Sequence, residues 1–357
     1  AGGGEYLRAL IDYYASRASE LMLVCKDLGV ESDADVDASR IVAFPKRLFD
    51  DLVSRLLLVP SFLGHRLFSI ASIVRGVDLV VIHNSRLGLF VPLLRLLAPS
   101  ARIVLHADNN EAKLAGQAPT GLSARGVATL LDRWLIPRSE AIGLRSADVS
   151  SAITSSDFGP EVVDFCTGLS VAGADPEPSS AAPREFDFLF VGSFDFFPNV
   201  DALLKLGKLS AAHPEIRFLI AGRALDRVLS EGDIPICENV TCISDFSTQD
   251  MPRLFRSASA FIAPLRLGSG MKIKIAQALS YGLPVVAAKD AIAGYERAVD
   301  AGVVLPLELE GGTSLGDLLA SVRFIDRAQV IDVWQECCSR AAFFDRLDAG
   351  LGRVLGL

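Results

Sequence analysis

The residues best suited to chemistry lie close together between Phe261 and Ala288, in the sequence FIAPLRLGSGMKIKIAQALSYGLPVVAA. The segment Gly268–Met271 contains two glycines, which let a backbone approach a ligand closely. Lys272 and Lys274 follow in the first turn of a predicted helix, where free N–H groups and the helix dipole favour anions. Two ammonium groups at such a helix end suit a diphosphate, and no metal is needed to neutralise it.

These groups are positioned by a strand, a loop, a helix and a second strand. An apolar strand is predicted over Ala260–Ala263, and Pro264 turns the chain into the glycine loop. The helix runs for about ten residues until Gly282 ends it, and Pro284 prevents its continuation. Val285–Ala288 begins the next buried strand. The alternative is an ordinary turn in a doubly wound sheet with two solvated lysines, because isolated glycine loops are weak signals.

Two stretches of the C-terminal half resemble a known family. PLRLGSGMKIKIAQALSYGLPVVAA resembles the nucleotide-sugar-binding segment of retaining glycosyltransferases of the GT-B fold, family 4 (glycosyl transferases group 1). FLFVGSFDFFPNVDAL, from Phe188 to Leu203, resembles the start of that family's C-terminal domain. Weaker matches continue through the N-terminal half. The resemblance implies an α/β protein with the GT-B fold, in which two Rossmann-like doubly wound domains face each other across a cleft.

The implied organisation divides the chain into four parts. These are an acceptor-side domain, a linker rich in Pro, Ser and Ala, a nucleotide-sugar-binding domain, and a helix that packs back on the N-terminal domain: residues 1–172, 173–185, 186–340 and 341–357. Gly3 and Gly4 are expected to form a loop on the acceptor side. In an alternating α/β domain such a loop normally follows a first strand, so we expect a strand ahead of Ala1.

The resemblance implies a donor site built from the C-terminal domain. Gly192–Ser193 forms a tight turn after the first strand, and Asn199 is expected to cap the next helix. Relatives often place a lysine near here that touches the diphosphate, and Asn199 or Arg223 takes its place. Phe246 lies where the nucleobase pocket is expected. The donor-binding residues are then Gly192, Ser193, Asn199, Arg223, Phe246, Gly268, Ser269, Gly270, Met271, Lys272, Lys274 and Gln277.

Two of these positions depart from the family's pattern. Relatives commonly carry two glutamates eight residues apart, and the second holds the ribose hydroxyls. Ser269 and Gln277 stand at those positions here. Some relatives also have a small residue at the first position. Gln277 still accepts a hydroxyl hydrogen bond, but without charge, so weaker donor binding is expected.

A second polar cluster follows a strand predicted over Ala101–Leu105. His106–Glu111 reads HADNNE, and His83, Asn84 and Ser85 occupy the same place after the preceding strand. Open α/β sheets bind ligands at the carboxyl ends of their strands. The residues alone leave two interpretations open, namely a polar catalytic site and a strand-to-helix turn capped by Asn or Asp.

Relatives in the family carry a segment like D-x-H-N-x-E at this place. Here His106 takes the Asp position and Asp108 takes the His position, while Asn109 and Glu111 match. The resemblance therefore implies that His106, Asp108 and Glu111 are the catalytic residues. The exchange leaves open which of them contacts the transferred sugar or the acceptor.

Length and composition allow two domains and exclude several classes of protein. A chain of 357 residues suffices for two domains of about 150–180 residues. Hydrophobic residues make up 50% of the chain, yet no apolar run approaches the roughly 20 residues of a membrane span. The six cysteines and four histidines show no metal-ligand spacing and no disulfide framework. An acidic run at 31–37 contains D-x-D, but no apolar strand leads directly into it. We expect a cytoplasmic protein with no metal and no cofactor.

The charge distribution bears on possible partners. A formal charge of −8 argues against nucleic acid. Residues 40–145 nevertheless contain fourteen Lys and Arg against seven Asp and Glu, with arginines among apolar residues at near-helical spacing. The block 40–147 could therefore contact the anionic inner face of a membrane or receive an anionic acceptor. A solvated helix flank is the alternative.

Residues and resemblance lead to one main functional hypothesis and two alternatives. The main one is a metal-independent retaining glycosyltransferase of the hexosyltransferase type, moving a sugar from a UDP- or GDP-sugar to a glycan or lipid-linked acceptor in surface polysaccharide synthesis. One alternative is a GT-B protein that binds a sugar nucleotide or a partner without turnover. The other is a Rossmann oxidoreductase or epimerase, for which the glycines after Ala1 lack the G-x-G-x-x-G spacing.

Overall fold

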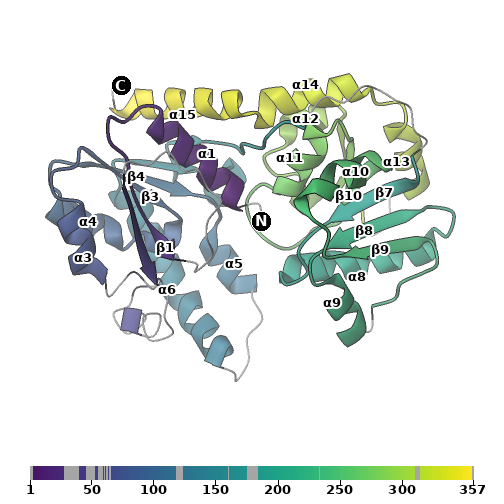
Figure 1. Cartoon of the computed structure of the whole chain (residues 1–357), viewed down its shortest axis with the longest axis horizontal. Helices are drawn as coiled ribbons and strands as arrows, with labels where there is room; N and C mark the ends of the chain where they lie inside the picture. The colour runs from purple at the N-terminus through teal and green to yellow at the C-terminus, as the bar shows by residue number, and fades with distance from the viewer. Residues whose placement is uncertain are drawn as a thin grey trace. The chain divides into compact units, whose positions relative to one another are not determined.

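Two compact units make up the chain. A computed structural model describes residues 3–27, 40–45, 53–54, 59, 61, 63, 66–117, 124–159, 161–174, 184–232, 234–309 and 314–355. The N-terminal unit contains Gly3–Thr167 together with Phe344–Leu357, and the C-terminal unit contains Gly168–Phe343. In both units parallel strands alternate with helices, so the chain is an α/β protein (Figure 1).

The N-terminal unit contains a two-stranded and a four-stranded parallel sheet. The smaller sheet pairs β1 (Met22–Asp27) with β2 (Arg40–Pro45). The larger sheet contains β3 (Leu79–His83), β4 (Arg102–Ala107), β5 (Val149–Ala152) and β6 (Phe165–Cys166), in chain order. The helices around them are α1 (Gly3–Ala15), α3 (Leu67–Ile73), the 3-10 turn η2 (Ser85–Leu87), α4 (Phe90–Leu97), α5 (Glu111–Gln117), α6 (Ala124–Ser146), α7 (Ser155–Phe158) and α15 (Arg340–Leu355).

Close helix packing fixes α6 against the sheet ends of this unit. A Cβ atom placed on Gly88 would lie 2.0 Å from the Ser139 carbonyl oxygen, and one on Gly143 would lie 2.4 Å from the Gly88 Cα. Only glycine allows this approach at both positions. The contact brings the inner side of α6 next to η2, at the carboxyl end of β3.

The last helix packs on the N-terminal unit. The Tyr13 and Phe344 rings meet edge to face, with centroids 5.3 Å apart. Arg17 donates to both carboxylate oxygens of Asp348, at 3.0 and 2.6 Å. The Arg346 side chain donates to the Thr167 carbonyl at 2.6 Å. Helix α15 therefore belongs with α1 although more than 300 residues separate them in the sequence.

The C-terminal unit is built on a six-stranded parallel sheet with the order β12-β11-β10-β7-β8-β9. Its strands are β7 (Phe186–Val191), β8 (Phe218–Gly222), β9 (Val240–Ser244), β10 (Ala258–Ala263), β11 (Val285–Ala288) and β12 (Val304–Leu307). Its helices are α8 (Phe197–Ala212), α9 (Leu225–Glu231), η3 (Thr248–Asp250), α10 (Met251–Arg256), α11 (Ile273–Ser280), η4 (Lys289–Ala291), α12 (Glu296–Asp300), α13 (Leu315–Val322) and α14 (Arg327–Cys338).

This strand order is that of a Rossmann fold, with a switch point between β7 and β10. The chain runs outward from β7 to β9 on one side, then returns to β10 on the other side of β7. Helices α8 and α9 cover one face of the sheet, and α10 and α11 cover the other (Figure 1). The loops after Val191 and Ala263 diverge at the switch point, which is where such sheets bind ligands.

Stacked phenylalanines form the core beneath these loops. Phe190 stacks on Phe261 with centroids 6.2 Å apart, and Phe261 stacks on Phe255 at 5.9 Å. Phe188 stacks on Phe218 at 5.9 Å. All five rings are fully or almost fully buried. Aromatic pairs of this geometry add to the free energy of burial, so the strands that carry the site loops are held in a rigid core.

Some expectations fall outside the described residues. These are the D-x-D run at 31–37 and the centre of the linker at 175–183. The cleft between the domains and the strand ahead of Ala1 stay predictions. Strand β6 was not predicted, and β4 ends at Ala107 rather than Leu105. Within the described part of the chain, no helix combines the length and apolarity that crossing a bilayer requires.

Candidate functional site

The glycine loop after β10 leads directly into helix α11. Gly268 and Gly270 have φ angles of +99° and +67°, which favour glycine over any residue with a side chain. A Cβ atom on Gly268 would also lie 3.3 Å from Lys272 Nζ. The Met271 side chain is buried and fixes the loop between the glycines and the helix. The sequence thus correctly predicts a strand, a glycine loop and a helix at this place.

Ser269 provides an unsatisfied polar group in this loop. The residue is 8% exposed. Its Oγ is buried and has no hydrogen-bond partner among the residues that the structure describes. A buried hydroxyl without a partner costs roughly 1–3 kcal/mol. A ligand oxygen that reached this hydroxyl would remove that penalty.

Lys272 stands at the N-cap of α11 and folds back over the loop. Its Nζ donates to the Ser269 and Gly270 carbonyls, both at 3.0 Å. The backbone of the helix provides no acceptor for the N–H groups of Ile273 and Lys274, at the start of its first turn. The ammonium group and these amides therefore form one positive region at the switch point.

Lys274 is partly buried and held on two sides. Its Nζ donates to Asn199 Oδ1 at 2.6 Å and lies 4.6 Å from the centroid of the Phe190 ring. Desolvation, together with the neighbouring charge of Lys272, lowers the pKa of Lys274 to about 7. The expectation of two fully charged lysines is therefore wrong, because Lys274 is only about half protonated at neutral pH.

Asn199 links the two sides of the switch point. Besides accepting from Lys274, it donates from Nδ2 to the Ser193 carbonyl at 2.7 Å. The expectation that Asn199 caps helix α8 is wrong, since the helix begins at Phe197 with Phe196 at the N-cap. Gly192 passes the Asn199 side chain so closely that a Cβ atom would lie 3.0 Å from it. The turn after β7 and helix α11 are thus connected through one amide group.

Arg223 lies beside this turn, at the end of β8. Its Nη2 donates to Ser193 Oγ at 3.1 Å, and its Nε pairs with Asp195 at 3.0 Å. The side chain remains 69% exposed. Gly222, just before it, approaches the Gly192 carbonyl so closely that an added Cβ would lie 1.7 Å from the oxygen. The structure therefore brings Gly192, Ser193 and Arg223 together.

Tyr295 is a residue of this site that the sequence analysis missed. It is fully buried, and its hydroxyl donates to the Lys272 carbonyl at 2.9 Å and accepts from the Ala276 N–H at 3.2 Å. The hydroxyl therefore holds both ends of the first turn of α11. Nothing in the local sequence signals this contact, because Tyr295 follows Lys272 by 23 residues.

The two remaining donor-site predictions lie on separate elements. Gln277 belongs to α11, one turn beyond its first residue. Phe246 follows β9 and is partly buried. Their roles toward a ribose and a nucleobase stay predictions.

In the N-terminal unit, the structure places His106 inside β4 rather than after it. The residue is completely buried. Its Nε2 lies 2.7 Å from the Tyr14 hydroxyl and its Nδ1 lies 2.5 Å from Ser151 Oγ. Burial, and to a smaller extent His83, lowers the pKa of His106 to about 3. The neutral ring joins α1 to the sheet through both nitrogens, and its predicted catalytic role stays a prediction.

Asp108 faces His83 at the carboxyl ends of β4 and β3. His83 Nε2 and Asp108 Oδ2 are 3.7 Å apart. His83 Nε2 and Asp108 Oδ1 are buried and lack hydrogen-bond partners within the described residues. Burial, and then the charge of Glu111, raises the pKa of Asp108 to about 7, while burial lowers the pKa of His83 to about 4. This pair holds a carboxyl group that changes protonation near neutral pH.

Glu111 is engaged by charged and polar neighbours. Arg86 Nε donates to its Oε2 at 2.6 Å, and Asn84 Nδ2 donates to its Oε1 at 3.3 Å. Its backbone N–H donates to Glu140 Oε2 at 3.0 Å, which also accepts from Ser85 at 2.6 Å. Asn84 has a φ of +86°, an uncommon value that places strain beside the site. The Glu111 carboxylate is therefore held by Arg86 and Asn84, and its predicted catalytic role stays a prediction.

Gly3 and Gly4 do not form a loop in the structure. Both belong to α1, and a Cβ atom on Gly4 would meet nothing within 4 Å. The prediction of a glycine loop is wrong because α1 begins at Gly3, although glycine is a poor helix former. Helix α1 instead contributes side chains to the site region, including Tyr6, whose ring lies 5.8 Å from that of His83.

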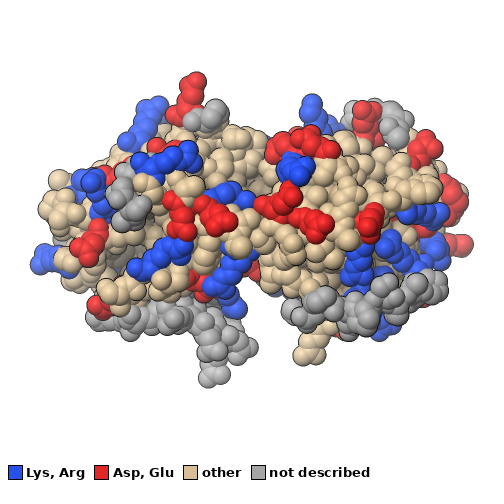
Figure 2. Space-filling view, turned by 90° about the horizontal axis from the view of Figure 1, so that it is seen from above, with Lys and Arg blue, Asp and Glu red and all other residues tan. Residues whose placement is uncertain are grey.

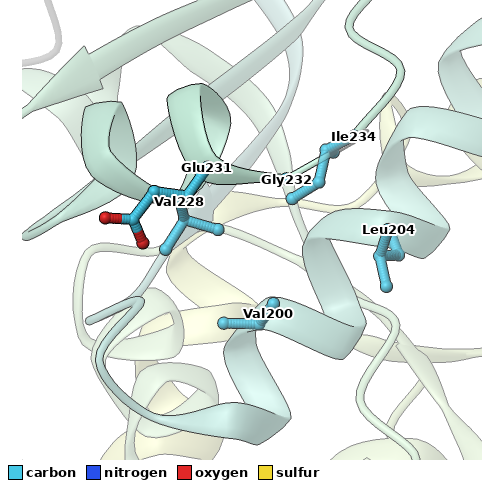
Figure 3. A pocket seen from close by; sticks show the side chains of 6 residues that line it. All are labelled: Val200, Leu204, Val228, Glu231, Gly232 and Ile234. Carbon is cyan, nitrogen blue, oxygen red and sulfur yellow. The ribbon is translucent and has the colours of Figure 1, made fainter.

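A separate apolar pocket lies between α8 and α9. It has a volume of about 280 Å³ and is lined by Val200, Leu204, Val228, Glu231, Gly232 and Ile234 (Figure 3). None of the residues predicted to bind the donor lines it. Among the described residues, no group of three or more His, Cys, Asp or Glu is arranged to hold a metal ion.

Comparisons with solved structures define the fold class. The N-terminal domain of Candida albicans trehalose-6-phosphate phosphatase has a TM-score of 0.61 at 11% identity, covering 96% of this chain and 92% of that one. The UDP-forming α,α-trehalose-phosphate synthase of Burkholderia vietnamiensis has a TM-score of 0.61 at 12% identity, covering 95% and 100%. TarM of S. aureus, in a complex that includes UDP, has a TM-score of 0.53 at 11% identity, covering 83% of this chain and 58% of that one. The chain therefore has the GT-B fold, with two Rossmann-like domains.

A sequence comparison adds the family of the C-terminal segment. Residues 185–310 match the family model of glycosyl transferases group 1. This segment runs from the start of the six-stranded sheet to its last strand, and it contains every residue predicted to bind the donor. No curated protein matches the chain in sequence. Residues 185–310 of the C-terminal unit are thus similar to the domain of group 1 glycosyltransferases.

Proposed function

We propose that the protein is a metal-independent retaining glycosyltransferase that transfers a sugar from a UDP- or GDP-sugar to a glycan or lipid-linked acceptor. The observation that carries this proposal is the glycine loop and helix α11 at the switch point of a sheet that matches the group 1 family. The UDP in the TarM structure supports a uridine nucleotide as one donor to test. Membership of family 4 and a role in surface polysaccharide synthesis are parts of the same proposal.

The donor diphosphate is proposed to bind at the N-terminus of α11. Lys272 Nζ, held above the loop by two carbonyls, can turn toward a phosphate oxygen. The first-turn amides and the Ser269 hydroxyl add donors around it. Each hydrogen bond to a charged group contributes roughly 1.5–3 kcal/mol. The contacts of Lys272 and Lys274 together would account for roughly two to four powers of ten in affinity or rate.

Catalysis in this proposal comes from stabilising the leaving group. The bond between the anomeric carbon and the diphosphate oxygen breaks as an oxocarbenium-like centre forms, and negative charge grows on the diphosphate. Fixed positive groups that meet this growing charge lower the barrier. Retention requires the acceptor oxygen to bond to the face that the diphosphate leaves. The acceptor proton then needs a nearby base.

The N-terminal unit offers Asp108 as that base. Its carboxyl group titrates near neutral pH, and its Oδ1 has no hydrogen-bond partner in the part of the chain that the structure describes. A base is most effective when its pKa lies near the working pH. His83, whose Nε2 lies 3.7 Å from Asp108 Oδ2, is neutral at that pH and so adds no positive charge that would keep the carboxyl group ionised. We assign Glu111 and His106 to positioning rather than to contact with the substrate.

Calorimetry with UDP-glucose and GDP-mannose tests the donor site. Lys272→Ala and Lys274→Ala should each weaken binding of the preferred sugar nucleotide by about tenfold or more, because each removes a charge-assisted contact. Lys208→Ala is the matched control, since it removes an exposed cation from α8 and should leave affinity unchanged. Equal affinity in all three variants would show that the diphosphate does not bind at α11.

Turnover with and without EDTA separates the proposal from a binding protein without activity. Gln277, in place of a charged ribose partner, is the observation that favours the second function. Release of UDP or GDP that survives chelation supports a metal-independent transferase. Tight binding with no release under any condition supports a sugar-nucleotide-binding protein. Loss of release on chelation would refute metal independence alone.

A further inference from the structure

Helix α6 exposes large apolar side chains along one side. Leu130, Leu131, Trp134 and Ile142 are 53%, 46%, 50% and 38% exposed, and we call these four residues the α6 stripe. At about 100° per residue they fall within roughly a third of the helix circumference, and they extend over about 18 Å. Single exposed apolar residues are ordinary, but several large apolar side chains gathered on one side of a helix mark an interaction surface.

The charges around the α6 stripe have one sign. Arg138 and Arg145 are exposed on the same side of the helix. Arg133 is also exposed, but it points to the side of the stripe and donates to the Ala115 and Gly116 carbonyls of α5 at 3.0 and 2.9 Å. The acidic residues of the helix, Asp132 and Glu140, are buried on the other side. Over residues 129–145, where the structure describes the side chains, every exposed charge is therefore positive. The face seen in Figure 2 differs, because acidic and basic side chains are interspersed over it.

Trp134 and Arg138 form an ordered pair in the middle of the stripe. The Arg138 guanidinium lies 4.0 Å from the centroid of the Trp134 ring, and its Nη1 donates to the Trp134 carbonyl at 2.9 Å. Tryptophan is enriched where an apolar phase meets water, because its ring is apolar and its N–H is polar. An arginine held at this depth is placed to meet a phosphate group.

We propose that the α6 stripe lies in the headgroup region of an anionic membrane, with Trp134 and the leucines inserted and the arginines contacting lipid phosphates. Interfacial helices combine Trp and Leu on the apolar side with basic residues at its border, and α6 has this pattern. The net positive charge of residues 40–145 is complementary to anionic lipid, although the chain as a whole carries −8. This inference stands whether or not the protein transfers sugars.

Sedimentation with vesicles tests the proposal on the full chain. Binding is expected to vesicles of phosphatidylcholine mixed with phosphatidylglycerol, and to be much weaker with phosphatidylcholine alone. Each arginine near an anionic surface contributes about 1 kcal/mol, or about fivefold. Arg138→Gln and Arg145→Gln should therefore each reduce binding by about fivefold. Equal binding to both kinds of vesicle would overturn the proposed charge contacts.

Trp134→Ala tests the apolar part of the contact. The Trp134 side chain would be buried in the lipid, so its removal should weaken vesicle binding by about tenfold or more. Phe324→Ala is the matched control, because Phe324 is a 91% exposed aromatic residue of the other unit. Both substitutions are at exposed positions, and circular dichroism with thermal unfolding confirms that each variant is folded. Equal binding by Trp134→Ala and Phe324→Ala would refute insertion of the stripe.

Fluorescence gives a readout that a change of fold would not produce. The chain has two tryptophans, and Trp334 is only 9% exposed, so Trp334→Phe leaves Trp134 as the reporter. Anionic vesicles should shift its emission to the blue and protect it from acrylamide. Gel filtration and light scattering test the competing occupant, a second protein copy. A dimer in the absence of lipid that Trp134→Ala dissociates, with no shift on adding vesicles, would overturn the membrane proposal.

Discussion

The titration of Lys274 provides a quantitative test of the donor site. With a pKa of about 7 in the free protein, Lys274 is about 90% protonated at pH 6 and about 10% protonated at pH 8. A bound diphosphate favours the charged form, so the complex contains the ammonium group. Binding at pH 8 must then include protonation of Lys274. The association constant of a sugar nucleotide should therefore fall by about tenfold between pH 6 and pH 8.

Calorimetry with UDP-glucose and GDP-mannose at pH 6, 7 and 8 measures this fall. Sugar nucleotides are suitable because their diphosphate has no group that titrates in this range, whereas free UDP does. Lys274→Met should bind more weakly at pH 6 and show no dependence on pH. Lys274→Arg should also lose the dependence, because a guanidinium remains charged throughout. The same tenfold fall in Lys274→Met, or a change below about twofold in the parent protein, would refute the reasoning.

Three further substitutions test other parts of the structure. Gly222→Ala should lower the free energy of unfolding by about 1–3 kcal/mol, because its Cβ would lie 1.7 Å from the Gly192 carbonyl oxygen. A denaturant titration measures this change, and unchanged stability would contradict the close approach. Tyr295→Phe should cost about 1–3 kcal/mol of stability and also weaken sugar-nucleotide binding, because the first turn of α11 loses its buried hydroxyl; normal binding would show that the turn holds its geometry unaided. With saturating sugar nucleotide, kcat should rise as the pH increases through about 7, where the Asp108 carboxylate forms. Asp108→Asn should remove both this rise and most of kcat, and a preserved rise would assign it to another group.

The fold of the C-terminal unit was accessible from the sequence because its signals are local. Strand β11 (Val285–Ala288) has the bounds that the sequence predicts, and strand β7 ends at Val191, directly before the turn predicted at Gly192–Ser193. Both are short apolar runs bordered by turn residues. The glycine loop was also accessible, because only glycine tolerates the positive φ values found at Gly268 and Gly270.

The details of the site depended on contacts that sequence patterns do not encode. Strand β4 is two residues longer than predicted and therefore includes His106. In this position the His106 ring points toward Tyr14 and Ser151. Strand ends are uncertain by about two residues when read from sequence. Asn199 was taken for a cap because its residue type favours that position. Its bond to Lys274 joins residues 75 positions apart, and such pairs become visible only in the folded chain.

The burial of Ser139 and Glu140 on the inner side of α6 has a practical consequence for anyone redesigning the protein. Ser139 Oγ accepts a hydrogen bond from the Leu89 N–H, and the Glu140 carboxylate accepts one from the Glu111 N–H. These two contacts fix the orientation of α6 about its own axis. Residue insertions or deletions in α6 would turn those anchors out of register by about 100° each. Variants designed for higher solubility without detergent should therefore replace exposed side chains of α6 by substitution alone, with no insertion or deletion in the helix.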